Sequence, residues 1–158
     1  MKSILLSVQP EFVEKIFSGQ KRIELRRRFI RDASDIDYLF IYCTAPISAI
    51  VGSAIIERVE ELTIEKIVDE RDQYTGIDRE RATNYFDGLE TGFAIWLSSV
   101  QKLKENICMD ELPALGVKRP PQSYSYVSTN VICKHLDHED LDRHQYLHSG
   151  GGRRRSAA

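Results

Sequence analysis

The stretch GQKRIELRRR, residues 19–28, combines five cationic side chains with a single carboxylate. In a strand, every second side chain points to the same face. That face would hold Arg22, Glu24, Arg26 and Arg28. A lone carboxylate among cations is expected to pair with an arginine, which leaves other guanidinium groups free to bind a phosphate or a base edge. Lys21 has the opposite parity and meets Glu24 only if a bulge or the preceding turn redirects it.

The same pattern is also typical of an exposed edge strand whose charges protect it against aggregation. Charge along the chain favours neither interpretation. Residues 1–31 carry a net charge of +5, residues 32–90 carry −9 and residues 91–158 carry +2. Such a polarised chain could present a basic face to an anion, or could simply have a solvated surface.

The remaining candidate groups are histidines, arginines and cysteines. His135 and His138, and His144 and His148, have spacings that would suit a metal on a helix. Their surroundings are polar and acidic, so we expect neither a metal nor a cofactor. Arg153–Arg155 follow three glycines and suit either a phosphate contact or a solvated end. The cysteines, Cys43, Cys108 and Cys133, are scattered, which argues against a disulfide framework and predicts a reducing, cytoplasmic location.

Hydrophobic periodicity predicts the elements that position these groups. Strands are expected at residues 4–8, 21–29, 37–44, 47–59, 91–103 and 124–128. Helices are expected from Pro10 to Gly19, from Thr63 to Arg71 and over residues 78–87. No apolar run approaches the roughly 20 residues of a membrane helix, and the apolar start is expected to be a strand rather than a secretory signal. Residues 1–132 are expected to form one domain, and residues 133–158 a polar, flexible tail.

The pattern Gly19-x-Lys21-x-x-Glu24-x-Arg26 resembles the GxKxxExR signature of the ASCH domain, the activating-signal-cointegrator homology domain. Residues 4–11 and 15–19 resemble the start of bacterial members, and the segment PPQSY at residues 120–124 resembles a late element of some of them. The resemblance spans about residues 3–130. It implies a mixed α+β, mainly β fold, namely a PUA-like β-barrel with a few peripheral helices. It also implies a cleft in which the lysine, glutamate and arginine of the signature meet.

The resemblance further implies a role in RNA handling, with RNA or a modified nucleotide as the ligand. The predicted binding residues are Lys21, Arg22, Glu24, Arg26, Arg28 and Tyr126. Tyr42, Trp96 and Tyr124 are further stacking candidates, although aromatic residues at such positions more often belong to a core.

The sequence leaves enzymatic activity open. A metal-independent ribonuclease would use Lys21 to stabilise the phosphorane, while Glu24 or a tyrosine moves the proton. Some small ASCH relatives deacetylate an acetylated cytidine with a threonine nucleophile and a later acid, here Glu70, Asp72 or Glu80. Glu24 occupies the threonine position, which argues against that reaction. A protein-interaction module is a third alternative, and the sequence leaves the oligomeric state and the ligand's identity open.

Overall fold

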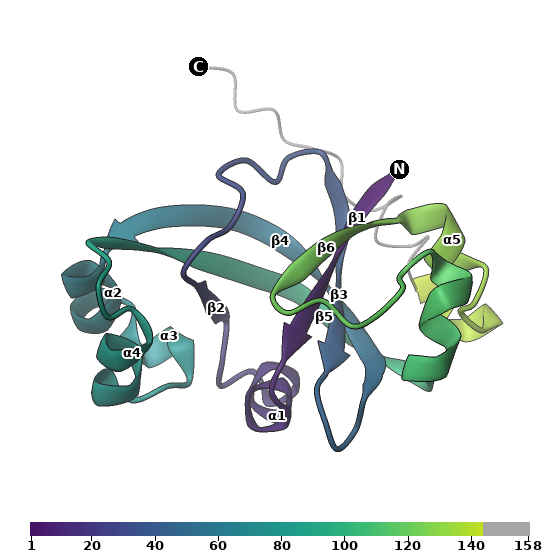
Figure 1. Cartoon of the computed structure of the whole chain (residues 1–158), viewed down its shortest axis with the longest axis horizontal. Coiled ribbons are helices and arrows are strands. Elements are labelled where there is room, and N and C mark those ends of the chain that lie inside the picture. Colours follow the sequence, from purple (N-terminus) through teal and green to yellow (C-terminus); the bar gives the residue numbers. More distant parts are fainter. Residues whose placement is uncertain (144–158) are drawn as a thin grey trace.

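One six-stranded sheet organises the chain (Figure 1). The computed structural model describes residues 1–143. The strands are β1 (Lys2–Val8), β2 (Ile23–Arg26), β3 (Ile36–Cys43), β4 (Ala49–Thr63), β5 (Thr91–Cys108) and β6 (Tyr124–Ser128). The helices are α1 (Pro10–Ser18), α2 (Ile64–Glu70), α3 (Asp72–Thr75), α4 (Arg79–Tyr85), α5 (Thr129–Cys133) and the 3-10 helix η1 (Met109–Leu115).

The strand order is β2-β5-β4-β3-β1-β6, and the pairs are antiparallel except for the parallel pair β1 and β3. The expected mixed α+β class with a majority of strand is confirmed, but the expected barrel does not close. The two edge strands β2 and β6 form no ladder with each other in the described part of the chain. β2 is only four residues long, and the gap beside it is occupied by side chains instead of a backbone ladder.

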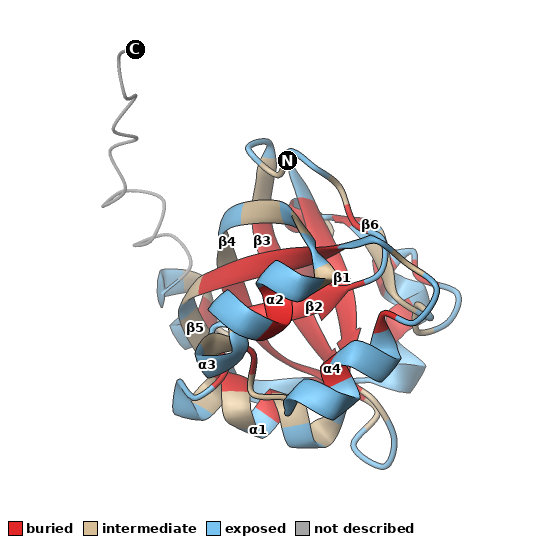
Figure 2. Ribbon diagram, turned by 90° about the vertical axis from the view of Figure 1, so that its left-hand side faces the viewer, coloured by how far each residue is buried: buried red, intermediate tan, exposed pale blue. Residues whose placement is uncertain are grey.

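Both faces of the inner strands are buried, which explains their nearly unbroken apolar sequences. On β1, Ile4 and Leu6 face a central core inside the curved sheet, while Leu5 faces an outer core covered by η1 and α5. Figure 2 shows buried residues along the strands and exposed residues along the outer surfaces of the helices. A third cluster joins Ile23 of β2 to Phe86, at the end of α4, and to other residues of α2 and β5.

Local sequence sets the ends of the helices that surround the site. α1 begins at Pro10, as expected, and ends at Gly19, whose φ of 82° suits glycine at a helix C-terminus. The Thr63 hydroxyl caps α2 by accepting a hydrogen bond from the Lys66 N–H, and Asp78 caps α4 in the same way. The segment carrying α2, α3 and α4 connects β4 to β5 and lies at the β2 end of the sheet (Figure 1).

Part of the expected tail packs against the body. Leu136 is buried in the outer core, residues 138–143 are helical, and the buried Asp140 carboxylate accepts a hydrogen bond from the Lys104 N–H. The boundary at residue 132 stays a prediction. His144, His148 and Arg153–Arg155 lie outside the described residues. None of the described helices is long and apolar enough to cross a membrane.

Candidate functional site

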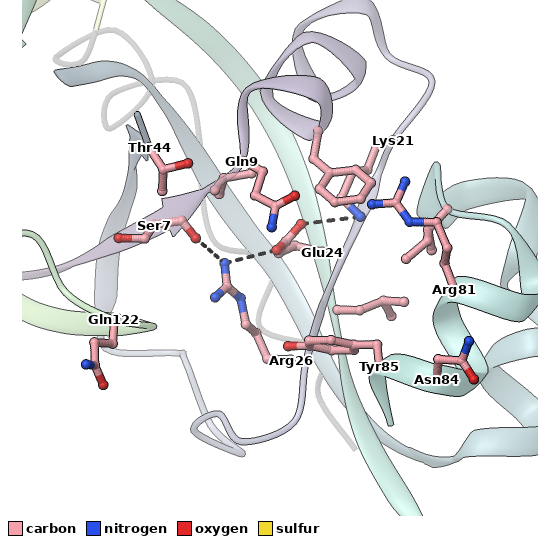
Figure 3. Close-up of a pocket in the computed structure, with 14 residues that line it drawn as sticks. Ser7, Gln9, Lys21, Glu24, Arg26, Thr44, Arg81, Asn84, Tyr85 and Gln122 are labelled. Carbon is pink, nitrogen blue, oxygen red and sulfur yellow. Dashed lines mark hydrogen bonds and ion pairs between the residues drawn. The ribbon is translucent and has the colours of Figure 1, made fainter. Parts of the chain in front are cut away.

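Three charged residues of the signature meet in a nearly buried cluster, the Lys21–Glu24–Arg26 triad. Lys21 Nζ lies 3.3 Å from Glu24 Oε2, and Arg26 Nη2 lies 3.0 Å from Glu24 Oε1. Each residue is less than 10% exposed. Figure 3 shows the carboxylate between the two cations, and the alternation of β2 places Glu24 and Arg26 on one face as expected.

The turn after α1 brings Lys21 into this cluster. Lys21 precedes β2, and its N–H donates to the Lys15 carbonyl at 2.9 Å, so the residue belongs to the helix end rather than to the strand. The side chain therefore escapes the alternation of the strand and reaches Glu24. Lys21 Nζ also donates to the Thr75 carbonyl at 2.5 Å and lies 5.1 Å from the centroid of the Phe12 ring.

Burial lowers the pKa of Lys21, while the negative charge of Glu24 opposes the shift. The amine therefore releases its proton more easily than an exposed lysine does. It remains close enough to Glu24 to form an ion pair when it is charged.

Arg26 spans the gap between the sheet edges. Its Nη2 donates to the Ser7 carbonyl of β1 at 2.5 Å, and its Nη1 lies 3.5 Å from Ser123 Oγ, just before β6. Arg26 Nε and Glu24 Oε2 are buried and have no hydrogen-bond partner among the described residues. The triad therefore retains one donor without a partner, Arg26 Nε, whereas Glu24 Oε2 faces the Lys21 ammonium at 3.3 Å.

The triad lines a cavity of about 440 Å³ between α1, β2 and α4. Glu24 is the one carboxylate among its lining residues. The others are Ser7, Val8, Gln9, Phe12, Lys21, Leu25, Arg26, Thr44, Ile77, Arg81, Asn84, Tyr85 and Gln122. Arg81 pairs with Glu11 at 2.7 Å, and desolvation raises the pKa of the Tyr85 phenol. The cavity thus combines cations, side-chain amides and one phenol around a single acid.

The chain is similar to a curated protein and to solved structures. A Zymomonas mobilis protein named ASCH domain-containing ribonuclease is 28% identical over 127 residues, which cover 80% of this chain and 84% of that protein. The crystal structure of ASCH from the same organism matches with a TM-score of 0.76 at 26% identity, over 84% of this chain and 92% of that one. Its tyrosine-to-phenylalanine variant matches with a TM-score of 0.77 at 26% identity, over 85% and 96% of the two chains. No family model matches the chain.

These likenesses to a curated ASCH protein and to solved ASCH structures support membership of the ASCH domain family. The family expected from the signature is therefore confirmed, and with it the fold class. In this ASCH domain, Lys21, Glu24 and Arg26 of the signature are the residues that the fold brings together.

The prediction that Arg22, Glu24, Arg26 and Arg28 share one face of a strand is wrong in part. Arg22 is exposed, and its guanidinium lies 5.7 Å from the Trp96 ring centroid. It precedes β2, so the alternation of the strand does not apply to it. Arg28 is exposed beyond the other end of β2. Neither residue lines the cavity, and their part in binding stays a prediction.

The aromatic candidates of the ASCH domain separate into core residues and one exposed residue. Tyr42 is buried in the outer core. Trp96 is buried beside the Arg58 guanidinium, which lies 4.0 Å from its ring centroid. Tyr124 is half-buried against Phe29, whereas Tyr126 is 50% exposed and lies outside the cavity.

Sequence reasoning missed the contribution of α4 to the cavity. Arg81, Asn84 and Tyr85 have spacings of three and four, which place them on one face of a helix. That spacing was visible in the sequence, but nothing local showed that this face meets β2. Glu70, Asp72 and Glu80, the acids considered for amide hydrolysis, do not line the cavity.

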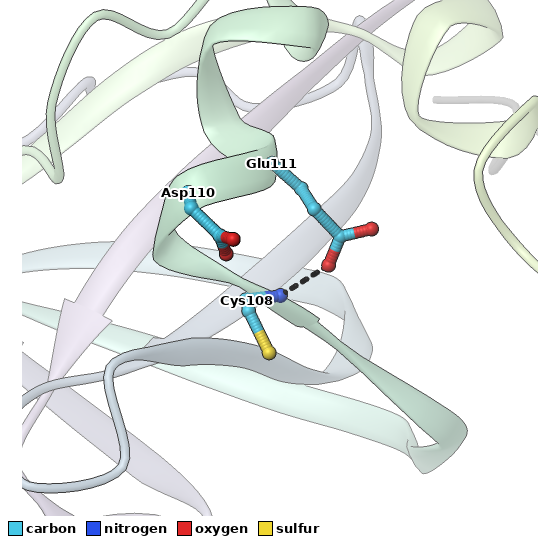
Figure 4. Close-up of side chains that lie close together, drawn as sticks. All are labelled: Cys108, Asp110 and Glu111. Carbon is cyan, nitrogen blue, oxygen red and sulfur yellow. Dashed lines mark hydrogen bonds between the residues drawn. The ribbon is translucent and has the colours of Figure 1, made fainter.

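One cluster has atoms that could hold a metal, and its local role is structural (Figure 4). Potential ligand atoms of Cys108, Asp110 and Glu111 lie within 4.8 Å of one another, and all three residues are exposed. The Glu111 carboxylate accepts a hydrogen bond from the Cys108 N–H at 2.8 Å, which caps the start of η1. Within residues 1–143, no histidine joins a cluster of potential metal ligands.

Proposed function

We propose that this ASCH domain binds RNA in the cavity, with a phosphate close to Lys21 and Arg26. The observation that carries the proposal is the lining itself: three cations and one carboxylate line a space of about 440 Å³. That volume lies within the range of about 300–1,000 Å³ that is typical of small-ligand sites. The curated relative is named a ribonuclease, which supports RNA as the ligand class.

Each part of the lining suits a part of a nucleotide. The guanidinium group of Arg26 and the ammonium group of Lys21 suit phosphate oxygens. The amides of Gln9, Asn84 and Gln122 offer both donors and acceptors, as base edges require. Arg26 is held by Ser7 and Glu24, so little side-chain freedom is lost when a phosphate binds.

Titration of labelled single-stranded RNA at low and moderate salt tests this proposal. We expect salt-sensitive binding, with a slope of about −0.7 in log K against log salt for each phosphate contact. Lys21→Met, which keeps the length of the buried chain, should weaken binding about 10-fold to 100-fold, since hydrogen bonds to charged groups contribute about 1.5–3 kcal/mol. Lys66→Met removes an exposed lysine of α2 and serves as the matched control. RNA binding that is unchanged in Lys21→Met would refute the assignment of the cavity as the RNA-binding site.

Cleavage of the bound RNA is a second candidate function, favoured by the position of the Glu24 carboxylate beside Lys21 in the cavity lining. In this reaction Glu24 accepts the proton of the ribose 2′-hydroxyl, and that oxygen forms a bond to phosphorus. The bond from phosphorus to the 5′-oxygen breaks as Tyr85 donates a proton to that oxygen. Lys21 stabilises the negative charge of the phosphorane. The products are a 2′,3′-cyclic phosphate and a 5′-hydroxyl.

The products identify this reaction. We expect mass spectrometry to detect the cyclic phosphate in the presence of a chelator, and expect no cleavage of an RNA with a 2′-deoxy substitution at the scissile position. Glu24→Gln should abolish cleavage under conditions in which the variant is folded. Cleavage of the deoxy substrate would contradict the mechanism. Glu24 in place of a threonine, with no second acid in the lining, argues against deacetylation of a modified cytidine.

A further inference from the structure

A second groove, of about 450 Å³, lies next to the cavity. It is formed by residues 116–126, which comprise the loop after η1 and the start of β6. Gln122 lines both the groove and the cavity, so the two spaces meet at this residue. We propose that the groove holds the next nucleotides of a single-stranded RNA whose phosphate occupies the cavity. This inference rests on the proposed function and deepens it, because it makes the ligand an extended strand rather than a single nucleotide.

The charges of the groove suit a phosphate backbone. Lys118 and Arg119 are exposed, line the groove and form no ion pair among the described residues. No carboxylate lines the groove. Two free cations without a competing acid form a short basic track, which attracts the phosphates of a single strand.

Tyr126 supplies the surface on which a base can stack. Half of the residue is exposed, although its ring packs edge-on against Tyr124 at a centroid distance of 6.2 Å. The Tyr124 ring packs in turn against Phe29 at 4.9 Å. Lys2 Nζ lies 4.7 Å from the centroid of the Tyr126 ring and pairs with Asp35 at 2.9 Å, so it supports the ring without adding a free cation. The ring is therefore held by its neighbours and still open to a ligand, as base stacking requires.

The loop between the two spaces is fixed to the sheet. The Ser7 hydroxyl donates to the Pro121 carbonyl at 2.6 Å, and the Ser7 N–H donates to the Ser123 carbonyl at 3.0 Å. Ser7 also accepts the hydrogen bond of Arg26 through its own carbonyl. One residue of β1 therefore connects the triad to the loop, and the distance between the phosphate position and the groove is set by the fold. The predicted binding residue Tyr126 thus has a place in the path, although it lies outside the cavity.

The dependence of affinity on strand length tests the path. The probes are labelled homopolymeric RNAs of one, two, four and eight nucleotides, a hairpin RNA whose bases are paired, and a polyglutamate peptide of matched charge. We expect affinity to rise with length, and Tyr126→Ala to weaken the four- and eight-nucleotide strands about 5-fold to 100-fold, since stacking contributes about 1–3 kcal/mol per base. Binding of the single nucleotide should not change. Tyr126→Phe keeps the ring and should bind like the wild type, whereas Lys118→Ala with Arg119→Ala should reduce the salt dependence for the longer strands.

The outcomes separate this inference from the proposed function. If a single nucleotide binds in a Lys21-dependent way and longer strands bind no more tightly, the path along the groove would be overturned. The assignment of the cavity would stay intact. Equal weakening of the hairpin by Tyr126→Ala would overturn stacking, because paired bases are not free to stack on the ring. If polyglutamate displaces the RNA, and Tyr126→Ala weakens polyglutamate binding as much as RNA binding, RNA would be overturned as the occupant of the groove. Absence of binding by any strand would refute the proposed function and this inference together.

Discussion

Replacement of Glu24 by glutamine isolates the energetic role of the triad. The substitution keeps the shape of the side chain but removes the one negative charge between Lys21 Nζ, at 3.3 Å, and Arg26 Nη2, at 3.0 Å. Two nearly buried cations would then remain without a counter-charge. Removal of one partner from a buried pair typically costs about 3–5 kcal/mol. The cavity borders the triad and the glutamine oxygen can still accept a hydrogen bond, so we expect the lower end, about 3 kcal/mol at pH 7.

The loss in free energy of unfolding caused by Glu24→Gln should depend on pH, because Lys21 titrates. Burial already lowers the pKa of Lys21, and Glu24 opposes that shift, so the variant should lower this pKa further. Above that pKa and below the ordinary value of 10.5, the folded state binds fewer protons than the unfolded state. The free energy of unfolding therefore rises with pH in this window, by at most about 1.4 kcal/mol per pH unit. The deficit of the variant should accordingly shrink once the pH passes the pKa of Lys21 in the variant.

Urea unfolding followed by fluorescence measures this effect, because Trp96 is the single tryptophan and is buried. The series should run from pH 6 to pH 9.5 for the wild type, Glu24→Gln, and the double variant Glu24→Gln with Lys21→Met. The double variant lacks the titrating amine of Lys21, so the pH-dependent part of its stability deficit should disappear. A deficit below about 1 kcal/mol at pH 7, or one that stays constant with pH, would refute the reasoning.

Three further substitutions test the frame around the site. Thr63→Ala removes the cap on the Lys66 N–H and should cost about 1 kcal/mol in urea unfolding; an unchanged midpoint would show that the cap is dispensable. Gly52→Ala would place a Cβ 2.5 Å from the Gln101 carbonyl oxygen and should cost about 1–3 kcal/mol, seen as a lower thermal midpoint. Leu136→Ala should cost about 2–5 kcal/mol if residues 133–143 belong to the packed body, whereas a loss below about 0.5 kcal/mol would assign them to a tail.

The sequence predicted the order of the main elements well, because each carries a strong local signal. Pro10 and Gly19 limit α1, and the alternation of Ile23 and Leu25 identifies β2. The ends of the long strands were harder to predict from the sequence. β4 was expected to end at residue 59 but continues to Thr63, and β5 was expected to end at Leu103 but continues to Cys108. These ends are largely polar and exposed, so they lack the periodicity that marks a half-buried strand.

Short helices and the walls of the cavity depend on tertiary contacts. η1 was not expected, because a seven-residue segment with Pro113 carries little helical preference of its own; burial of Leu112 and Leu115 in the outer core stabilises it. The signature predicted that Lys21, Glu24 and Arg26 converge. It could not show that α4 completes the cavity, because that contact joins residues about 60 positions apart.

The position of the first strand, between β3 and the late edge strand β6, has a consequence for folding during synthesis. β1 pairs with β3 on one side and with β6 on the other, where Ile4 lies opposite Tyr126. At about 5–20 residues per second, a ribosome needs roughly 6–25 s to add the residues between these two positions. Throughout that interval an apolar strand has at least one edge without a partner, open to mispairing with another nascent chain. A chaperone or the ribosome surface would therefore act most usefully on this ASCH domain before β6 emerges.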